Sequence, residues 1–191
     1  SGAFESSYAW YGMKLAVSFA LLAVSLWLLL QPPLVAVLLG AVLLGLFWQQ
    51  LAFLGHDVCH NAITHRRALD YALAIALSPA FGVAPAWWKR SHNMHHVVTN
   101  SVECDPDLQH LPVFAVDEAY MGNFFSRYHE RVMPFDVFAR ALVPLQHWLY
   151  YPIMALARFN MYVQVWIVFV KDPHVPWRAA QVVTHLLYWV W

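Results

Sequence analysis

The sequence GHDVCHN at residues 55–61 follows a long apolar run, and a second polar stretch, WWKRSHNMHH, occupies residues 87–96. His56 and His60 are four positions apart, so on a helix they project from one face, one turn apart. The three histidines of the second stretch are spaced three and four positions apart and would share a helical face in the same way. Five imidazoles that converge from two helix ends predict a nitrogen-rich metal site with the ligands His56, His60, His92, His95 and His96.

The residue types narrow the kind of metal. Imidazole suits iron, copper, nickel and zinc. Cys59 and Cys104 stand alone without paired spacing, which argues against a structural zinc site and against a disulfide framework. A histidine pair at helical spacing is common in proteins that bind no metal. Two histidine groups that follow hydrophobic segments favour a site, because ionisable side chains at the membrane or its edge are costly unless they serve one.

The composition predicts an integral membrane protein. The chain has 191 residues, of which 61% are hydrophobic and 12% charged, about half the charged share of an average soluble domain. The formal net charge is zero, so nothing indicates nucleic-acid binding. No signal peptide is expected, since residues 15–30 are long, very apolar and not followed by a small-residue cleavage site. The first residue is not methionine and the last residues are apolar, so we expect a fragment of a longer polypeptide.

Two apolar runs predict a transmembrane hairpin over residues 15–54, after a short amphipathic lead-in. The runs at 15–30 and 34–54 are separated by Gln-Pro-Pro, and as helices they reach roughly 24 and 31 Å. Lys14 precedes the first run and arginines 66 and 67 follow the second. By the positive-inside rule both outer ends are cytosolic, which puts the first histidine pair at the cytosolic mouth of the second span.

Residues 68–88 are long enough to cross the bilayer, yet they contain Asp70, Pro79, Gly82 and Pro85. If this segment crossed, the two histidine groups would face opposite compartments and could not meet. We therefore expect an interfacial or re-entrant pair of short helices, broken near Pro79 to Pro85.

The rest of the chain divides by charge and hydropathy. Residues 97–140 gather many charges and predict a water-facing region with some short helix, so that residues 55–140 as a whole form a cytosolic or interfacial metal-binding region. Residues 141–170 predict a helix that lies against the bilayer or lines a cavity, followed by a turn at 171–178. Residues 179–191 open a further spanning helix, so 141–191 combines interfacial and transmembrane helices. The fold class is all-α, a polytopic membrane protein.

The ligand set also limits the chemistry. Few carboxylates accompany the histidines, unlike in soluble di-iron bundles, and the zinc-protease pattern His-Glu-x-x-His is absent because Asp57 holds the second position. A neutral-ligand site at a membrane surface suits redox-active iron that meets a hydrophobic substrate and dioxygen. Four residues are candidates to accept hydrogen bonds from the histidine rings, with surface exposure or helix capping as the alternative: Asp57, Asn61, Asp105 and Asp107.

A family resemblance follows from the order of these motifs. A hydrophobic hairpin, then His-Asp-x-x-His at residues 56–60 and His-x-x-His-His at 92–96, resembles the membrane fatty acid desaturase superfamily. The flanking WWKR at 87–90 and DPDLQHLP at 105–112, with the later YP and RFNMY segments at 151–162, resemble the front-end desaturases. These include sphingolipid Δ8 desaturases and the Δ6, Δ5 and Δ4 acyl enzymes. The resemblance covers about residues 40–170.

The resemblance implies a multi-pass, non-haem di-iron oxygenase of the endoplasmic reticulum whose histidines face the cytosol. Such an enzyme removes two hydrogens from an acyl or sphingoid chain, using dioxygen and electrons from cytochrome b5 and its reductase. The five histidines map onto family ligands, and His110 belongs to the family pattern as a residue that shapes the site. The family's third box, Gln-x-x-His-His, and a cytochrome b5 domain are missing from residues 1–191. We therefore expect a desaturase domain truncated at its C-terminal end and inactive in isolation.

Two other functions remain open from the sequence. A lipid hydroxylase could use the same di-iron scaffold, and nothing in the sequence separates hydroxylation from desaturation. A membrane metal transporter would place histidines mid-span, facing a pore, whereas these histidines follow the ends of apolar runs. Two substrates also remain open, a sphingoid base and a polyunsaturated acyl chain. The residues at 87–96 slightly favour the sphingoid base. The other histidines are expected at the surface, at the membrane interface or in packing: His65, His129, His147, His174 and His185.

Overall fold

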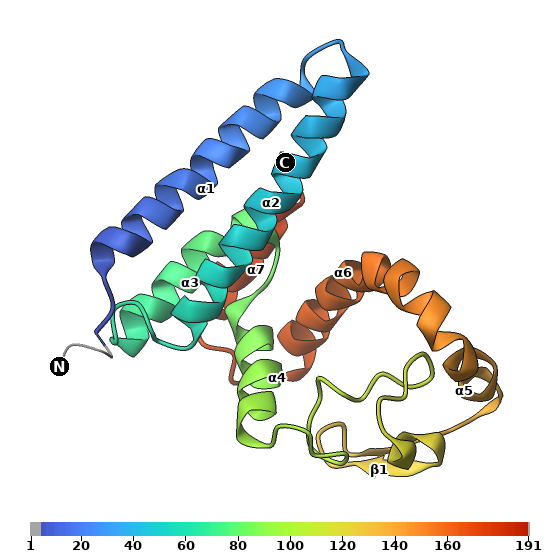
Figure 1. Ribbon diagram of the computed structural model, residues 1–191. Helices are drawn as coiled ribbons and strands as arrows, with labels where there is room; N and C mark the ends of the chain where they lie inside the picture. Colours follow the sequence, from blue (N-terminus) through green and yellow to red (C-terminus); the bar gives the residue numbers. More distant parts are fainter. Residues whose placement is uncertain (1–4, 191) are drawn as a thin grey trace. The chain divides into compact units, whose positions relative to one another are not determined.

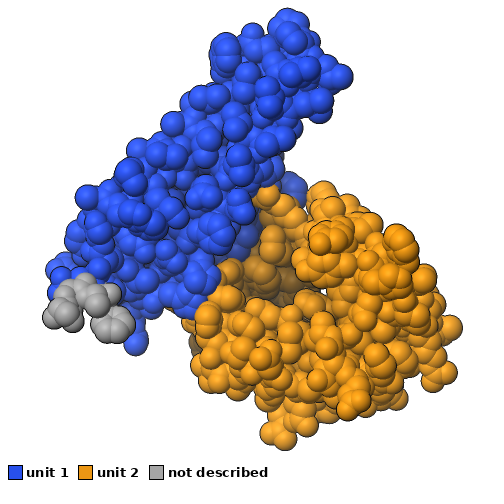
Figure 2. All heavy atoms as spheres, viewed as in Figure 1, with its two compact units in different colours: residues 1–85, 176–191 blue, residues 86–175 orange. Residues whose placement is uncertain are grey.

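The computed structural model describes residues 5–190; residues 1–4 of the predicted lead-in, and Trp191, lie outside the described part. The chain divides into two compact units, unit 1 (residues 1–85 and 176–191) and unit 2 (residues 86–175) (Figures 1 and 2). The elements in chain order are α1 (Tyr8–Leu29), α2 (Leu34–Cys59), α3 (Arg67–Phe81), α4 (Pro85–Val97), the 3-10 helix η1 (Glu118–Met121), β1 (Phe124–Ser126), β2 (Arg131–Met133), α5 (Val137–Leu142), the 3-10 helix η2 (Val143–Leu145), α6 (Gln146–Lys171) and α7 (Arg178–Tyr188).

Helices α1 and α2 of unit 1 form the predicted hairpin and run side by side (Figure 1). Ser7 caps α1 by accepting a hydrogen bond from the backbone N–H of Trp10 at 3.3 Å. Pro33 directly precedes α2, where its missing N–H costs no helical hydrogen bond. Both helices are long and apolar enough to cross a membrane. The all-α membrane fold with a helical hairpin is thus confirmed, and α2 continues past the predicted end into the first histidine stretch.

A close approach between small residues holds the hairpin together. The hydroxyl of Ser25, fully buried in α1, donates to the carbonyl oxygen of Gly40 in α2 at 2.7 Å. A Cβ added at Gly40 would lie 3.0 Å from backbone atoms of Ser25 and Leu29. Without a hydrophobic driving force in lipid, helices associate through such close packing and interhelical hydrogen bonds. Gly40 therefore sets how closely the two helices approach each other.

Replacing Gly40 with leucine should open this contact. We expect Gly40→Leu to lose about 1–3 kcal/mol of stability through overpacking, seen as a lower thermal unfolding midpoint of the full-length protein in detergent. Gly45→Leu is the matched control, because a Cβ there meets nothing within 4 Å. Equal midpoints for the two variants would contradict the assigned contact.

The segment after the hairpin is broken where the sequence predicts. Helix α3 ends at Phe81 and is capped by Gly82, whose φ of 77° is a left-handed conformation that suits glycine. The hydroxyl of Ser78 donates to Ala74 and Val83 carbonyls across this end. Helix α4 then begins at Pro85. The two predicted short helices are confirmed, whereas the membrane side of each remains a prediction.

The loop between α2 and α3 is fixed by a buried carboxylate. Asp70 is fully buried, and its two oxygens accept from the backbone N–H of Thr64 at 3.0 and 3.3 Å. A buried carboxylate is tolerated when it receives such hydrogen bonds. This contact holds the turn that directly follows the first histidine pair.

Helix α7 completes unit 1 by packing against α3. Its buried face carries two polar residues, Gln181 and His185, both 0% exposed. The side-chain amide of Gln181 donates to the hydroxyl of Tyr71 on α3 at 2.8 Å. A spanning helix was expected to open here; α7 is a helix of 11 residues, and whether it opens a span stays a prediction.

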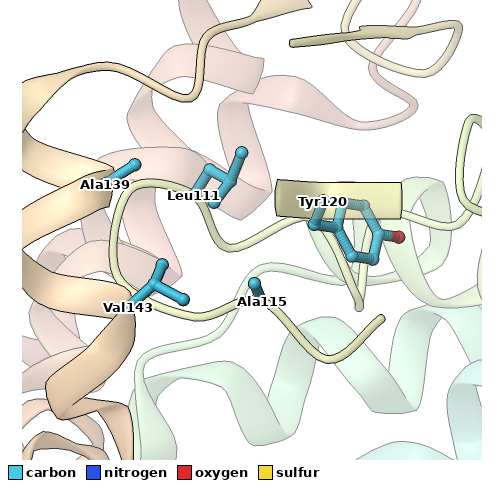
Figure 3. Close-up of a cluster of buried hydrophobic side chains, with 5 residues drawn as sticks. All are labelled: Leu111, Ala115, Tyr120, Ala139 and Val143. Carbon is cyan, nitrogen blue, oxygen red and sulfur yellow. The ribbon is translucent and has the colours of Figure 1, made fainter. Parts of the chain in front are cut away.

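Unit 2 is centred on a small apolar cluster. Leu111 and Ala115, from the loop that follows α4, face Ala139 of α5 and Val143 of η2, with Tyr120 of η1 beside them (Figure 3). Tyr120 and Ala139 are fully buried.

Strands β1 and β2 pair antiparallel in this unit, with Phe125 opposite Val132. The sequence interpretation of residues 97–140 as charged chain with short helix missed this hairpin. Three-residue strands are too short to show an alternating pattern.

Residues 137–171 form α5, η2 and α6 without a break in the chain, and this stretch is long and apolar enough to span a membrane. Asp136 caps α5 by accepting from the backbone N–H groups of Phe138 and Ala139 at 3.0 Å. The predicted turn after Lys171 is confirmed. Whether α6 crosses the bilayer or lies against it, as the sequence suggested, stays a prediction.

Candidate metal centre

The last turn of α2 presents His56 and His60, called here the first histidine group. The two rings are edge to face with centroids 4.5 Å apart, as expected for positions i and i+4 of one helix. His60 is the C-cap residue, and its backbone N–H still donates to the carbonyl of His56 at 3.0 Å. Val58 and Cys59 point into the protein and are buried. The predicted shared face is confirmed.

Asp57 links this group to the first helix. One carboxylate oxygen lies 3.1 Å from Nδ1 of His56, and the other accepts a hydrogen bond from the hydroxyl of Tyr11 on α1 at 3.1 Å. With Nδ1 held by the carboxylate, Nε2 is the nitrogen of His56 that would face a metal.

The last turns of α4 present His92, His95 and His96, called here the second histidine group. Their ring centroids lie 4.5 to 5.7 Å apart. The Nε2 atoms of His92 and His96 are 2.9 Å apart. Two nitrogens bound to one metal at roughly 2.1 Å and about 90° would be about 3 Å apart. This pair therefore has the spacing of two ligands of one ion.

Asp105 is the buried anchor of the second group. Its side chain is 0% exposed, and its oxygens lie 2.9 and 3.0 Å from Nδ1 of His95. The backbone N–H groups of Asn100 and Asp107 also donate to it, each at 2.9 Å. Three donors on one carboxylate offset its burial. The Nδ1 of His95 is thereby occupied, which again directs Nε2 outward.

Asp107 lies near two histidines of the same group. One of its oxygens is 3.5 Å from Nδ1 of His92 and 3.9 Å from Nδ1 of His95, and the hydroxyl of Ser91 donates to its other oxygen at 3.4 Å. Burial raises the pKa of Tyr128, and its side-chain hydrogen bonds to Ser91 and Arg90, which connect it to this network, lower the pKa by less.

The remaining two candidates have different surroundings. Asn61 stands in the turn after α2 with a left-handed φ of 57°, and its backbone N–H donates to Val58 at 3.1 Å. His110 is exposed, and its ring packs edge-on against Phe114 in the loop of unit 2. Asn61 thus belongs to a turn and His110 to a loop.

Several residues of these networks were missed by the sequence interpretation. Tyr11 belongs to the amphipathic lead-in and was not singled out as a site residue, and it lies 46 positions from Asp57, beyond any spacing rule. Ser91 and Tyr128 also escaped notice. A signal existed for Ser91, which directly precedes His92.

The donor set fits an iron centre. Every candidate ligand atom is an imidazole nitrogen, and each histidine group has at least one ring whose Nδ1 lies against a carboxylate. Imidazole nitrogen is a good ligand for iron, and a carboxylate behind the ring fixes its tautomer and raises its basicity.

Residues 32–191 match the family described as fatty acid desaturase. The chain belongs to the fatty acid desaturase family. It is 38% identical to Delta(8)-fatty-acid desaturase 2 of Arabidopsis thaliana over 94% of the chain and 38% of that protein. Delta 8-(E)-sphingolipid desaturase of Emericella nidulans is 41% identical over 80% of the chain and 29% of that protein.

A third relative, the Delta 8-(E)-sphingolipid desaturase of Komagataella phaffii, is 46% identical over 67% of the chain and 24% of that protein. The desaturase chain thus spans 24 to 38% of the length of these three relatives. No solved structure matches it. The resemblance to front-end and Δ8 sphingolipid desaturases that the motifs predicted is confirmed.

The anchoring role of Asp105 can be tested by stability. Asp105→Asn should destabilise the full-length protein by about 1.5–3 kcal/mol, because an amide has one acceptor oxygen and its NH₂ opposes the donors around it. Thermal unfolding followed by intrinsic fluorescence measures this.

Glu103→Gln is the matched control, since it removes the same charge two residues away, where the carboxylate is 53% exposed and pairs with exposed Arg127. Similar midpoints for Asp105→Asn and Glu103→Gln would contradict the anchoring role.

Proposed function

We propose that the full-length protein is a non-haem di-iron desaturase that introduces a double bond into the chain of a membrane lipid. The observation that carries this proposal is the second histidine group, in which two Nε2 atoms stand 2.9 Å apart on a helix backed by a buried carboxylate. Membership of the desaturase family and relatives named Δ8 desaturases support it. Those names favour a sphingoid base or an acyl chain as substrate.

The proposed iron ligands are the two histidine groups together. Their meeting at one centre is part of the proposal. Asp57, Asp105 and Asp107 would hold ring Nδ1 protons, while Asn61 and His110 would shape the backbone beside the ligands. Five nitrogens are fewer than two iron ions need, so further ligands would come from elsewhere in the full-length protein.

Bound iron would supply, with dioxygen, the oxidising power needed to remove two hydrogens from an unactivated chain. The chain's own residues would do simpler work. Asp105 would hold a proton on Nδ1 of His95 and so fix the direction of the ring. Asp57 would do the same for His56. The exposed apolar surfaces of α1 and α2 would keep the protein in the bilayer, where the substrate chain lies.

The cellular setting is part of the same proposal. Electrons would come from cytochrome b5 and its reductase, and the protein would be a multi-pass enzyme of the endoplasmic reticulum with its histidine groups on the cytosolic side. The 191-residue chain alone would be inactive.

Lipid profiling tests the reaction. A yeast host that lacks the product should, on expressing the full-length protein, accumulate a sphingoid base or acyl chain two hydrogens lighter by mass spectrometry. His56→Ala and His92→Ala should each abolish this product. His174→Ala should not, because His174 is exposed in the turn after α6. A product heavier by one oxygen would indicate the hydroxylase instead, and little bound iron would indicate the transporter.

Labelling tests the placement of the two groups. Arg66→Cys and Val97→Cys place thiols in exposed positions after the first and second histidine groups; Cys104→Ser removes the partly exposed native thiol, and Cys59 is buried. In sealed microsomes both new thiols should react with a membrane-impermeant maleimide from the cytosolic side. Reaction from opposite sides would refute the shared centre.

A further inference from the structure

The first helix contributes a polar contact to the first histidine group. The hydroxyl of Tyr11 donates to one oxygen of Asp57 at 3.1 Å, and the second oxygen of the same carboxylate lies 3.1 Å from Nδ1 of His56. A continuous chain of hydrogen bonds thus runs from α1 through a carboxylate to a candidate iron ligand. All three residues belong to unit 1.

Tyr11 is held in place by the start of its helix and by the packing of its ring. Below it, Ser7 caps α1, and the hydroxyl of Ser6 donates to the carbonyl of Ile63 in the loop after α2. Its ring packs against the apolar cluster of the hairpin, which contains Phe47 and Leu51. Tyr11 is therefore held by packing independently of its hydroxyl.

The hydroxyl of Tyr11 limits the rotation of the Asp57 carboxylate. Asp57 is only 33% exposed at its side chain, and a carboxylate beside its own histidine in sequence can rotate about its side-chain bonds. A second hydrogen bond to the other oxygen fixes that rotation. It also fixes which oxygen faces the imidazole, and hence the tautomer and direction of the ring.

We propose that Tyr11 is a positioning residue of the desaturase, which orients His56 for iron through Asp57. This inference rests on the proposed function and extends it, since it assigns to the first transmembrane helix a part in building the metal site. Tyr11 itself does not touch the metal or the substrate.

The test uses Tyr11→Phe in the full-length protein. Phenylalanine keeps the ring and its packing, so only the hydrogen bond is lost. We expect iron affinity, measured by chelator competition with Fe(II) alone, to fall about tenfold, in line with other partners behind metal ligands. We also expect the Mössbauer quadrupole splitting of bound ⁵⁷Fe to change, which a residue that served packing alone would leave as it is.

Tyr8→Phe is the matched control, because Tyr8 lies one turn earlier on the same helix and is 64% exposed. It should leave affinity and spectrum unchanged. Asp57→Asn should weaken iron binding by about 10–100-fold, and adding Tyr11→Phe to it should cause little further loss, because both act through one carboxylate.

The outcomes separate the two proposals. If Tyr11→Phe behaves like Tyr8→Phe, or if its effect adds fully to that of Asp57→Asn, the positioning role is wrong while the iron site stands. If His56→Ala retains full iron binding, the proposed ligand set itself is wrong.

Discussion

A carboxylate that holds one nitrogen of an imidazole fixes which nitrogen faces away from it, and such a contact orders one ring in each histidine group. In the second group the holder is Asp105, a carboxylate without solvent exposure that collects two backbone N–H groups as well as the ring of His95. The chain after α4 must fold back to place it there. The loop over residues 98–107 therefore folds around the two carboxylate oxygens of Asp105. The left-handed φ of 66° at Asn100 belongs to this loop.

The membrane imposes the second constraint, and it explains why small and polar residues occur inside apolar helices. Ser25 and Gly40 let α1 and α2 touch, and the hydroxyl satisfies its hydrogen bond at the contact itself. A hairpin packed in this way gives α2 a fixed partner along its length. Helix α2 then packs against α1 along its apolar length and carries the candidate ligands His56 and His60 at its last turn.

Much of this architecture could be predicted from the sequence because it follows from local rules. Apolar length and the Gln-Pro-Pro break locate the hairpin, and histidine spacing locates the shared helical faces. The Asp-Pro-Asp segment marked Asp105 as a candidate, and the structure places it against His95. Its complete burial could not be predicted, since that depends on the packing of unit 2. Tyr11 could not be found either, because its partner lies 46 positions away on another helix.

The end of α2 shows how unit 1 combines these constraints. A Cβ at Gly55 would lie 2.9 Å from the ring of Phe81, so the residue directly before His56 must be small for α3 to pack here. On another side, the hydroxyl of Tyr11 reaches Asp57 from α1. The last turn of α2 is thus fixed by a van der Waals contact from α3 and a hydrogen bond from α1. A terminal helical turn such as the one that carries His56 and His60 would otherwise fray, because terminal turns have few internal hydrogen bonds. Contacts from two neighbouring helices give it the rigidity that a metal site requires.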